Sequence, residues 1–205
     1  MKKFKSVFFS HHDPALLPVF RKAIIGIAGA GGIGSNVALS LARVGIGKLI
    51  IADYDNVEVT NLNRQQYFIK QIGEPKVEAL KENLEKINPF SEYIIHNVRL
   101  NAGNLLKIFK KVDILIEAFD KAESKQMMIE IWTENFPLKP LIVASGVAGI
   151  GKNDLIRTQQ IDSLFIVGDQ ISEVKEKISP LAPRVGIVAN MQANLALELL
   201  VKKYG

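Results

Sequence analysis

The stretch GAGGIGS at 29–35, followed by IADYDNVEVTNLNRQQ at 51–66, decides how this chain folds. Gly29, Gly31 and Gly34 have the G-x-G-x-x-G spacing that predicts a tight turn between a strand and a helix. In such a turn the missing side chains let phosphate oxygens approach the amino end of the helix, and Gly32 removes one more side chain. The turn alone is a weak signal, because a close strand-helix contact without any ligand uses the same glycines.

Polar side chains directly after the second strand-like run make the signal stronger. Asp53 closes that run near the spacing expected for a carboxylate that accepts hydrogen bonds from ribose hydroxyls. Thr60, Asn61 and Asn63 then supply neutral donors, and Arg64 supplies a planar fork of N–H groups suited to phosphate oxygens. A nicotinamide enzyme needs no such run at this place. The stretch therefore favours a triphosphate site over a dinucleotide site.

Three further residues are candidates for the same site. Lys76 lies in the first turn of a helix predicted over 73–88, where the helix dipole disfavours a cation unless an anion is near. Asp120 ends the run EAFD at the carboxyl end of a predicted strand and is suited to Mg²⁺, which keeps several waters and bridges to phosphates. Lys121 is a candidate phosphate contact. The alternatives are ordinary solvated surface for Arg64, Lys76 and Lys121, and a helix N-cap for Asp120.

The order of elements predicts one α/β domain over residues 1–205. Apolar strand-like runs at 23–29, 48–53, 93–99, 112–118 and 141–149 alternate with helical patterns at 35–45, 73–88, 101–111 and 124–135. We therefore expect a doubly wound, mostly parallel, Rossmann-like sheet. The runs at 153–161 and 163–169 predict an antiparallel C-terminal extension, 170–183 a loop, and 184–203 a long packed helix.

Composition excludes several classes of protein. The net charge of +5 is spread along the chain without an arginine-rich arm, so we expect no nucleic-acid partner. The absence of cysteine rules out disulfides and a thiolate zinc cluster, and no zinc is expected. The apolar stretch 7–9 is too short for a signal peptide, and the uncharged run 23–42 holds too many glycines for a bilayer helix. We therefore expect a cytoplasmic protein that does not associate with a membrane.

The remaining candidates favour structural roles. His11 and His12 have no further ligand nearby for a metal, and His96 alternates within a strand. Trp132 and the methionines at 127 and 128 fit packing of a helix against the sheet, although a place beside an adenine stays open. Arg21 fits either surface or a phosphate contact.

These residues together resemble the ThiF/MoeB family of sulfur-carrier-protein adenylyltransferases, which is related to the ubiquitin-activating enzymes. The matching stretches are GAGGIGS, DYDNVEVTNLNRQQ, GEPK before a helix that ends in INP, and EAFD. The later ASGVAG and APRVGIVANMQANLALELL are also similar, so the resemblance covers most of the chain and looks closest to a short ThiF-like form.

The resemblance implies a reaction and roles for the site. In that family the residue matching Asp53 holds the ATP ribose, those matching Arg64 and Lys76 hold the phosphates, and the one matching Asp120 binds magnesium. ATP would adenylate the C-terminal glycine carboxylate of a ubiquitin-like sulfur carrier ending in Gly-Gly, here a ThiS-like carrier of thiamine synthesis, releasing pyrophosphate. A homodimer and a separate sulfur donor protein are also implied.

The chain departs from the family pattern in its ligands and its N-terminus. The paired C-x-x-C zinc ligands and the crossover-loop cysteine of many relatives are absent, so another protein must load the sulfur. The R-Y-x-R-Q-like segment that donates an arginine to the partner subunit's site is also absent, and Arg21 is a weak substitute. The alternatives that stay open are an NAD-dependent oxidoreductase, a nucleotide-binding scaffold without chemistry, and a molybdopterin pathway instead of thiamine.

Overall fold

A seven-stranded sheet forms the centre of the protein in the computed structural model, which describes residues 2–172 and 178–204. The strand order is β3-β2-β1-β4-β5-β7-β6. The strands are β1 (Ile24–Ala28), β2 (Lys48–Asp53), β3 (Glu92–Asn97), β4 (Ile114–Glu117), β5 (Leu141–Ala144), β6 (Arg157–Ile161) and β7 (Leu164–Gly168). Neighbouring strands run parallel except for β6, which pairs antiparallel with β7. The predicted mostly parallel sheet with an antiparallel extension is confirmed.

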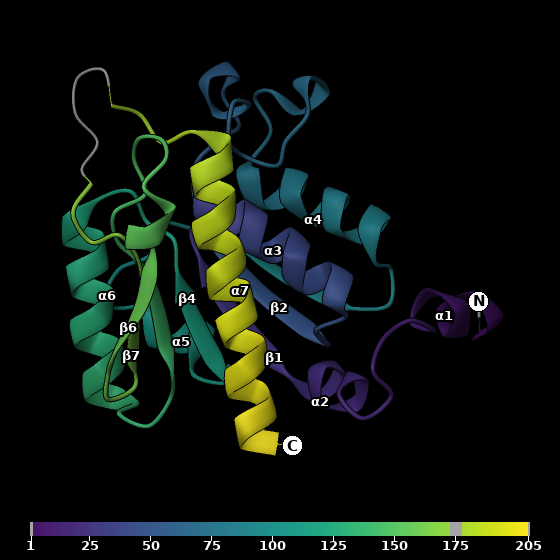
Figure 1. The fold of residues 1–205 in the computed structure, drawn as a ribbon. Helices are drawn as coiled ribbons and strands as arrows, with labels where there is room; N and C mark the ends of the chain where they lie inside the picture. Colours follow the sequence, from purple (N-terminus) through teal and green to yellow (C-terminus); the bar gives the residue numbers. More distant parts are fainter. Residues whose placement is uncertain (1, 173–177, 205) are drawn as a thin grey trace.

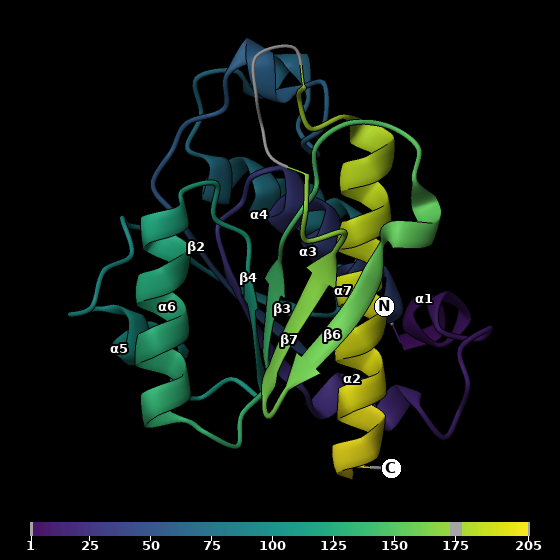
Figure 2. The ribbon, with the colours of Figure 1, turned by 60° about the vertical axis from the view of Figure 1, so that its left-hand side comes forward.

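Helices cover both faces of this sheet (Figure 1; Figure 2). The helices α3, α4 and α7 belong to one apolar cluster, and α5 and α6 belong to the other. The helices are α1 (Lys2–Phe8), α2 (Leu17–Lys22), α3 (Gly32–Val44), α4 (Lys76–Ile87), α5 (Leu105–Phe109), α6 (Ala122–Asn135) and α7 (Ala182–Tyr204). Short 3₁₀ turns occupy Val59–Asn61, Ile69–Gln71 and Asn153–Leu155. The layered arrangement is the doubly wound fold that the alternation of elements predicts.

The two apolar clusters explain several residues that the sequence left between structure and function. Trp132 and Met128 are fully buried in the cluster under α5 and α6, and the Trp132 indole N–H donates to the Lys139 carbonyl at 3.2 Å. Their packing role is confirmed. Within the residues that the structure describes, no helix is both long and apolar enough to cross a membrane.

The strand register sets the place of the functional residues. Ala28 pairs with Ala52 on one side and with Glu117 on the other, so β1, β2 and β4 end at the same edge of the sheet. The glycine turn, Asp53 and the segment after β4 therefore meet at this edge, as doubly wound folds require.

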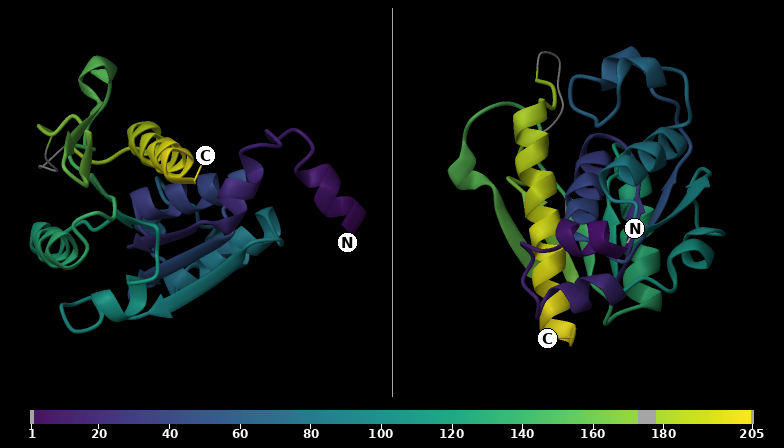
Figure 3. Two further views of the ribbon diagram at one scale, coloured as in Figure 1. Left: turned by 90° about the horizontal axis from the view of Figure 1, so that it is seen from below. Right: turned by 90° about the vertical axis from the view of Figure 1, so that its right-hand side faces the viewer.

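Two regions differ from the sequence-based prediction. Residues 2–22 form α1 and α2, which no periodicity predicted, and α1 lies away from the sheet (Figure 3). Its phenylalanines contact Phe90 of another segment, with the Phe8 and Phe90 ring centroids 5.7 Å apart, so the order comes from a tertiary contact. The predicted strand over 153–161 is wrong in its first part, because Asn153–Leu155 forms a 3₁₀ turn.

Candidate functional site

A cavity of about 810 Å³ opens at the edge where the parallel strands end. The glycine turn and the residues after β2 form one wall, and the segment 144–148 together with Ser172 and Pro180 forms the opposite wall. Asp120, Lys121 and Lys125 also line the cavity. The cavity therefore gathers side chains that lie far apart in the sequence.

The glycines of the turn serve two purposes, close packing and space at the cavity. Gly29 has a φ of +103°, and a Cβ there would lie 2.6 Å from the Ala118 carbonyl oxygen. A Cβ on Gly34 would lie 1.9 Å from the Gly29 carbonyl oxygen, so Gly34 serves close packing and does not line the cavity. Gly31 and Gly32 do line it, and Gly31 is the N-cap of α3. Free N–H groups of the first helical turn thus lie at the cavity, where a Cβ on Gly31 would come no closer than 3.9 Å to another side chain and one on Gly32 would come within 3.3 Å of Val185.

Asp53 supports this turn as well as lining the cavity. Its Oδ2 accepts a hydrogen bond from the Ala30 N–H at 2.6 Å, and its Oδ1 accepts one from the Asp55 N–H at 2.8 Å. Tyr67 anchors the turn from the other side by donating its hydroxyl to the Ala30 carbonyl at 2.6 Å. Burial, with the negative charges of Asp53 and Asp55, raises the pKa of Tyr67 well above its usual range, so this donor keeps its proton. Each Asp53 oxygen retains a lone pair for a further donor.

Lys76 and Arg64 line the same cavity, but neither is free of protein partners. Lys76 opens α4, its side chain is 8% exposed, and its Nζ lies 2.9 Å from Asp55 Oδ2. Asp55 thus supplies the anion that the dipole argument assigned to a ligand. The half-buried Arg64 donates from one nitrogen to the Thr60 carbonyl at 3.1 Å and to Asn63 Oδ1 at 2.7 Å. Its other donors have no partner among the described residues.

The neutral donors between Asp53 and Arg64 serve mainly to shape the loop. The Thr60 hydroxyl donates to Glu58 at 3.2 Å and does not line the cavity, so its predicted nucleotide contact finds no place in the geometry. Asn61 does line the cavity, and its Oδ1 accepts from the Glu58 N–H at 3.0 Å. Asn63 holds Arg64. The loop therefore orients the arginine more than it offers donors of its own.

Asp120 and Lys121 are exposed residues at the cavity between β4 and α6. The alternative that Asp120 caps α6 is wrong, because the N-cap of α6 is Lys121 and makes no side-chain hydrogen bond there. Over residues 2–172 and 178–204, no cluster of three or more His, Cys, Asp or Glu side chains is placed to hold a metal ion. Asp120 is thus a single carboxylate facing the cavity.

Sequence reasoning missed an ion pair at the cavity between the buried carboxylate of Glu117 and Lys125, which lines the cavity. Glu117 ends β4 with no exposed surface, and both Lys125 of α6 and the Phe119 N–H, the latter at 2.7 Å, donate to its carboxylate. Burial raises the pKa of Glu117, and Lys125 acts against that rise. Lys125 also donates to the Ala144 carbonyl at 2.7 Å. A glutamate inside the apolar run VDILIEA is the sequence signal for such a pair.

Three other cavity residues also escaped prediction. The Arg99 guanidinium lies over the Tyr54 ring at 5.6 Å, and both residues are exposed at the rim. Gln65 is buried, and its Oε1 finds no partner among the described residues. It follows Arg64 directly, so the polar run was the available signal.

Other candidates lie outside the site. Arg21 donates to the Phe90 carbonyl at 2.5 Å and to Ser91 Oγ at 3.1 Å. Because it precedes β1 in the chain, it lies at the opposite edge of the sheet from the cavity. Its predicted alternative role as a phosphate contact is wrong. His12 Nε2 lies 3.3 Å from the Arg43 carbonyl oxygen, and His96 sits within β3 opposite Ala52.

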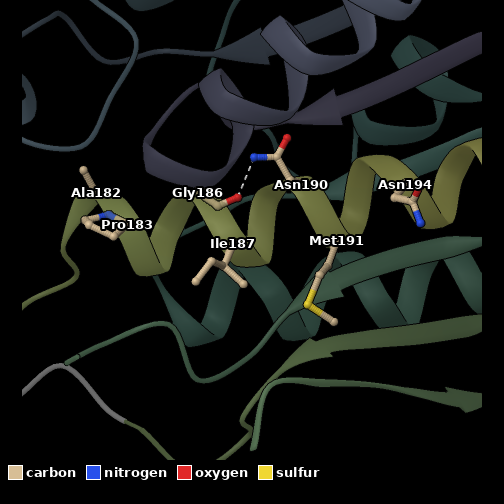
Figure 4. Close-up of a pocket in the computed structure, with 7 residues that line it drawn as sticks. All are labelled: Ala182, Pro183, Gly186, Ile187, Asn190, Met191 and Asn194. Carbon is tan, nitrogen blue, oxygen red and sulfur yellow. Dashed lines mark hydrogen bonds between the residues drawn. The ribbon is translucent and has the colours of Figure 1, made fainter. Parts of the chain in front are cut away.

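A second cavity, of about 620 Å³, lies along one face of α7 (Figure 4). Ile187 and Met191 point to the same side of the helix, and the Asn190 amide donates to the Gly186 carbonyl at 2.8 Å. The lining residues are Ala182, Pro183, Gly186, Ile187, Asn190, Met191 and Asn194. Since none of them titrates, this cavity offers no group for acid-base chemistry or for phosphate.

A family model described as "ThiF family" matches residues 8–204. The chain belongs to the ThiF family. This ThiF-family chain is 36% identical over 109 residues to the adenylyltransferase and sulfurtransferase MOCS3 of Aedes aegypti, covering 53% of the chain and 25% of the relative. It is 33% identical over 133 residues to the ubiquitin-like modifier-activating enzyme 5 of Caenorhabditis briggsae, covering 56% and 31%. The chain thus spans about a quarter to a third of the length of these curated relatives.

Solved structures share the ThiF-family fold. The E. coli tRNA N6-threonylcarbamoyladenosine dehydratase TcdA in complex with AMP matches with a TM-score of 0.87 at 21% identity, covering 97% of this chain and 94% of that chain. E. coli MccB with MccA-N7isoASN matches with a TM-score of 0.71 at 23% identity, covering 91% and 59%. At these identities the likeness establishes the fold.

Proposed function

We propose that this ThiF-family protein uses ATP to adenylate the C-terminal carboxylate of a small ubiquitin-like protein. The observation that carries the proposal is the cavity that places the amino end of α3, Asp53, Arg64 and Lys76 around one space. A helix amino end and two cations favour a polyanion, and a carboxylate beside them favours a ribose. The names of the MOCS3 and modifier-activating relatives are consistent with this activity.

The nucleotide would lie with its phosphates on the glycine turn. Gly31 leaves room for the phosphates beside the N–H groups of α3, and Asp53 would accept from the ribose hydroxyls. Arg64 would turn its unpaired nitrogens to the phosphates, and Lys76 would share its three N–H donors between Asp55 and a phosphate. Lys121 would add an exposed positive charge at the mouth. The solved structures of TcdA in complex with AMP and with ATP, which share this fold, support this placement.

The reaction needs charge neutralisation more than proton transfer. An oxygen of the carrier's carboxylate attacks the α-phosphorus, the bond to the bridging oxygen breaks, and pyrophosphate leaves with the electron pair. The carboxylate is already ionised at neutral pH, so no general base is required. The barrier is the approach of one anion to another, and Arg64 and Lys76 would lower it by placing positive charge on the phosphates.

Magnesium fits the site as a partner of the nucleotide. Asp120 is one exposed carboxylate at the cavity, and Mg²⁺ in nucleotide sites is usually held by one or two carboxylates, waters and substrate phosphates. Asp120 would therefore be the carboxylate that holds the ion, together with the phosphates of the nucleotide. When bound, the ion neutralises charge on the phosphates. The chain's own residues bind, orient and desolvate the reacting groups.

The finer parts of the proposal concern the partners. The proposed carrier is a ThiS-like protein of thiamine synthesis that ends in Gly-Gly. A separate donor protein would supply the sulfur, and the reaction would take place in the cytoplasm. A molybdopterin or other carrier is the alternative, and MOCS3 carries a sulfurtransferase in its name. For the predicted homodimer, the apolar face of α7 offers an exposed surface, on which Ile187 is 39% exposed (Figure 4).

The test is carrier-dependent exchange of pyrophosphate into ATP. The protein is incubated with ATP, Mg²⁺, labelled pyrophosphate and each of a panel of ubiquitin-like carriers that end in Gly-Gly. We expect exchange with one carrier and a gain in that carrier's mass equal to AMP. Nucleotide binding without exchange by any carrier would support the scaffold alternative, and a thermal shift with NAD but not with ATP would support the oxidoreductase. Sedimentation of the free protein tests the homodimer separately.

A further inference from the structure

The cavity wall that lies opposite the glycine turn and the residues after β2 is held in place by a second ion pair, and both side chains of this pair are buried. Asp169 follows β7 and Arg184 lies in the first turn of α7, and their side chains are 4% and 5% exposed. Arg184 donates from one nitrogen to Asp169 and from another to the Gly151 carbonyl. The guanidinium therefore joins three segments: the one after β5, the one after β7, and the start of α7. We call Asp169 and Arg184 the clasp.

The carboxylate of the clasp holds the backbone after β7 in one conformation. Asp169 Oδ1 accepts from the Ile171 N–H at 2.9 Å and from the Ser172 N–H at 2.8 Å, and its Oδ2 accepts from the Ser172 hydroxyl. Burial alone would raise the pKa of Asp169, but the bonds from Ser172 and Ile171 and the charge of Arg184 bring it down to about 2. Asp169 is therefore ionised at neutral pH, and each of its two oxygens accepts two hydrogen bonds.

The same carboxylate sets the position of the segment after β5. A Cβ on Gly146 would lie 1.9 Å from Asp169 Oδ1, and Gly146 has a φ of +78°. The Gln170 N–H donates to the Ser145 carbonyl at 3.1 Å, and the Asp169 N–H donates to the Gly146 carbonyl at 3.3 Å. Gln170 itself has a φ of +59°, which is uncommon for a non-glycine residue. The two segments are thus fixed against each other by contacts centred on Asp169.

This fixed wall differs chemically from the nucleotide wall. Among the residues that the structure describes, it consists of the small or apolar residues 144–148 with Ser172 and Pro180, and the charged side chain beside it is Lys125 of α6, which donates to the Ala144 carbonyl. The Lys125 ammonium is held by the Glu117 carboxylate and the Ala144 carbonyl, and the other described residues of this wall offer no positive charge to a phosphate. A surface made mostly of small, uncharged residues, with backbone N–H and carbonyl groups, fits an extended peptide end made of small residues.

A buried ion pair is a costly way to hold two segments, and apolar residues of similar volume often give equal or greater stability. What the pair adds here is direction, because a guanidinium fork and a carboxylate with several acceptors fix geometry. We propose that the clasp is a positioning element that shapes the wall for the carboxyl-terminal tail of the acyl substrate and takes no part in holding ATP. The proposal rests on the adenylation function proposed above and deepens it.

The test uses a double variant that removes both charges together. Asp169→Asn/Arg184→Gln keeps hydrogen-bonding groups at both positions and leaves no unpaired buried charge. Arg184→Lys keeps the charge but loses the planar fork, so it is expected to recover part of the function. The matched control is Glu198→Gln/Lys202→Gln, which breaks an exposed ion pair at the other end of the same helix.

Pyrophosphate exchange is measured as a function of carrier and of ATP concentration, with the carrier that the wild type accepts as the probe. We expect the KM for the carrier to rise at least tenfold in the double variant and the KM for ATP to stay within twofold. The control should change neither value. Equal rises in both KM values, or no rise in either, would overturn the proposal and leave the adenylation function intact.

A second measurement does not depend on activity. Hydrogen–deuterium exchange of the unliganded protein follows the amides of 145–151 and 169–172, with those of β1 and β2 as an internal reference. We expect at least tenfold faster exchange in the first two segments of the double variant and no change in the reference. Unchanged hydrogen–deuterium exchange in these two segments would overturn the proposed role of the clasp even where no carrier is active. Absence of exchange activity in the wild type with every carrier would instead count against the adenylation function.

Discussion

The two walls of the cavity are built on different principles. The nucleotide wall comes mainly from one stretch of the sequence, with Asp53, Asp55 and Arg64 within one loop region and the glycine turn separated from them by α3 and β2. The opposite wall is made of backbone from separate crossovers and is held by Asp169 and Arg184, which are both buried. Charge faces the cavity on the first wall and is hidden behind the second. The comparison suggests that one wall binds and the other positions.

The largest effects should come from the charges that face the cavity. We expect Arg64→Ala or Lys76→Ala to remove at least about 3 kcal/mol of transition-state stabilisation, on the scale of a lost oxyanion donor. The reason is that each removes positive charge from the phosphates as the carrier's carboxylate approaches. Steady-state pyrophosphate exchange gives kcat/KM for each variant.

The control variants remove an arginine or a lysine at positions outside the cavity. Arg43→Ala at the far end of α3 and Lys81→Ala on the exposed side of α4 remove cations that do not line the cavity. Both should exchange pyrophosphate at the wild-type rate. Near-normal exchange in Arg64→Ala and Lys76→Ala would remove the chemical basis of the nucleotide wall.

The glycines of the nucleotide wall should separate packing from binding. Gly34→Ala would place a methyl group 1.9 Å from the Gly29 carbonyl oxygen. We expect it to lower the free energy of unfolding by about 3 kcal/mol, the upper end for overpacking. Gly31→Ala, whose nearest neighbour would be Gln65 Nε2 at 3.9 Å, should leave unfolding unchanged.

Urea unfolding and calorimetric titration with ATP distinguish the two glycines. Gly31→Ala should unfold like the wild type and bind ATP at least tenfold more weakly, because its methyl group would occupy the space before α3. Equal ATP affinity in Gly31→Ala and the wild type would mean that phosphates do not approach the turn.

The sequence predicted the first wall because its signals are local. The spacing of glycines and the run after Asp53 lie in one continuous stretch, and the strand and helix periodicities gave β2 and α3 with nearly the observed ends. The family resemblance then linked Lys76 and Asp120 to the same edge, where the structure places them. What the sequence could not give was the partner of Lys76, because the contact with Asp55 crosses an irregular loop.

The second wall lacked such signals. Asp169 lies at the end of a strand-like run and Arg184 at the start of a helix, and each is an ordinary choice at such a place. Their burial follows only from the packing of α7 against β5 and β7. The N-terminal helices were missed for the same reason, because Phe8 and Phe90 meet only in the folded chain. Local patterns predict elements, whereas contacts between distant elements need the fold.

An acid titration should expose the hidden pair of the second wall. The pKa of Asp169 is about 2 in the folded protein, below its value of about 3.9 in an unfolded chain. The stabilisation is therefore complete above about pH 4 and is lost as the pH falls toward 2. We expect the wild type to lose about 2 kcal/mol more than Asp169→Asn/Arg184→Gln over this range, by the linkage of pKa to stability.

Urea unfolding at several pH values measures this difference. Glu117 acts in the opposite direction, because burial raises its pKa in the folded state, so its contribution is greatest in acid and is lost as the pH rises. The double variant leaves Glu117 in place, so the difference between wild type and variant isolates the clasp. Parallel acid profiles in the two proteins would show that Asp169 has no depressed pKa.

The smallest effect should come from the rim, and it sharpens the contrast between charge inside and outside the cavity. Arg99 is exposed and lies over the Tyr54 ring at 5.6 Å, so Arg99→Ala should cost less than about 1 kcal/mol of stability. An exposed cation mainly assists the approach of an anion and is screened by salt over a Debye length of about 10 Å at 0.1 M. We therefore expect Arg99→Ala to bind ATP about threefold more weakly than the wild type at low salt, on the modest scale of a rim charge. At high salt the two proteins should bind ATP equally well. Lys76→Ala, which removes a buried cation, should weaken binding at both salt concentrations. Stopped-flow binding of a fluorescent ATP analogue measures both, and a salt-independent loss in Arg99→Ala would place Arg99 within the nucleotide wall.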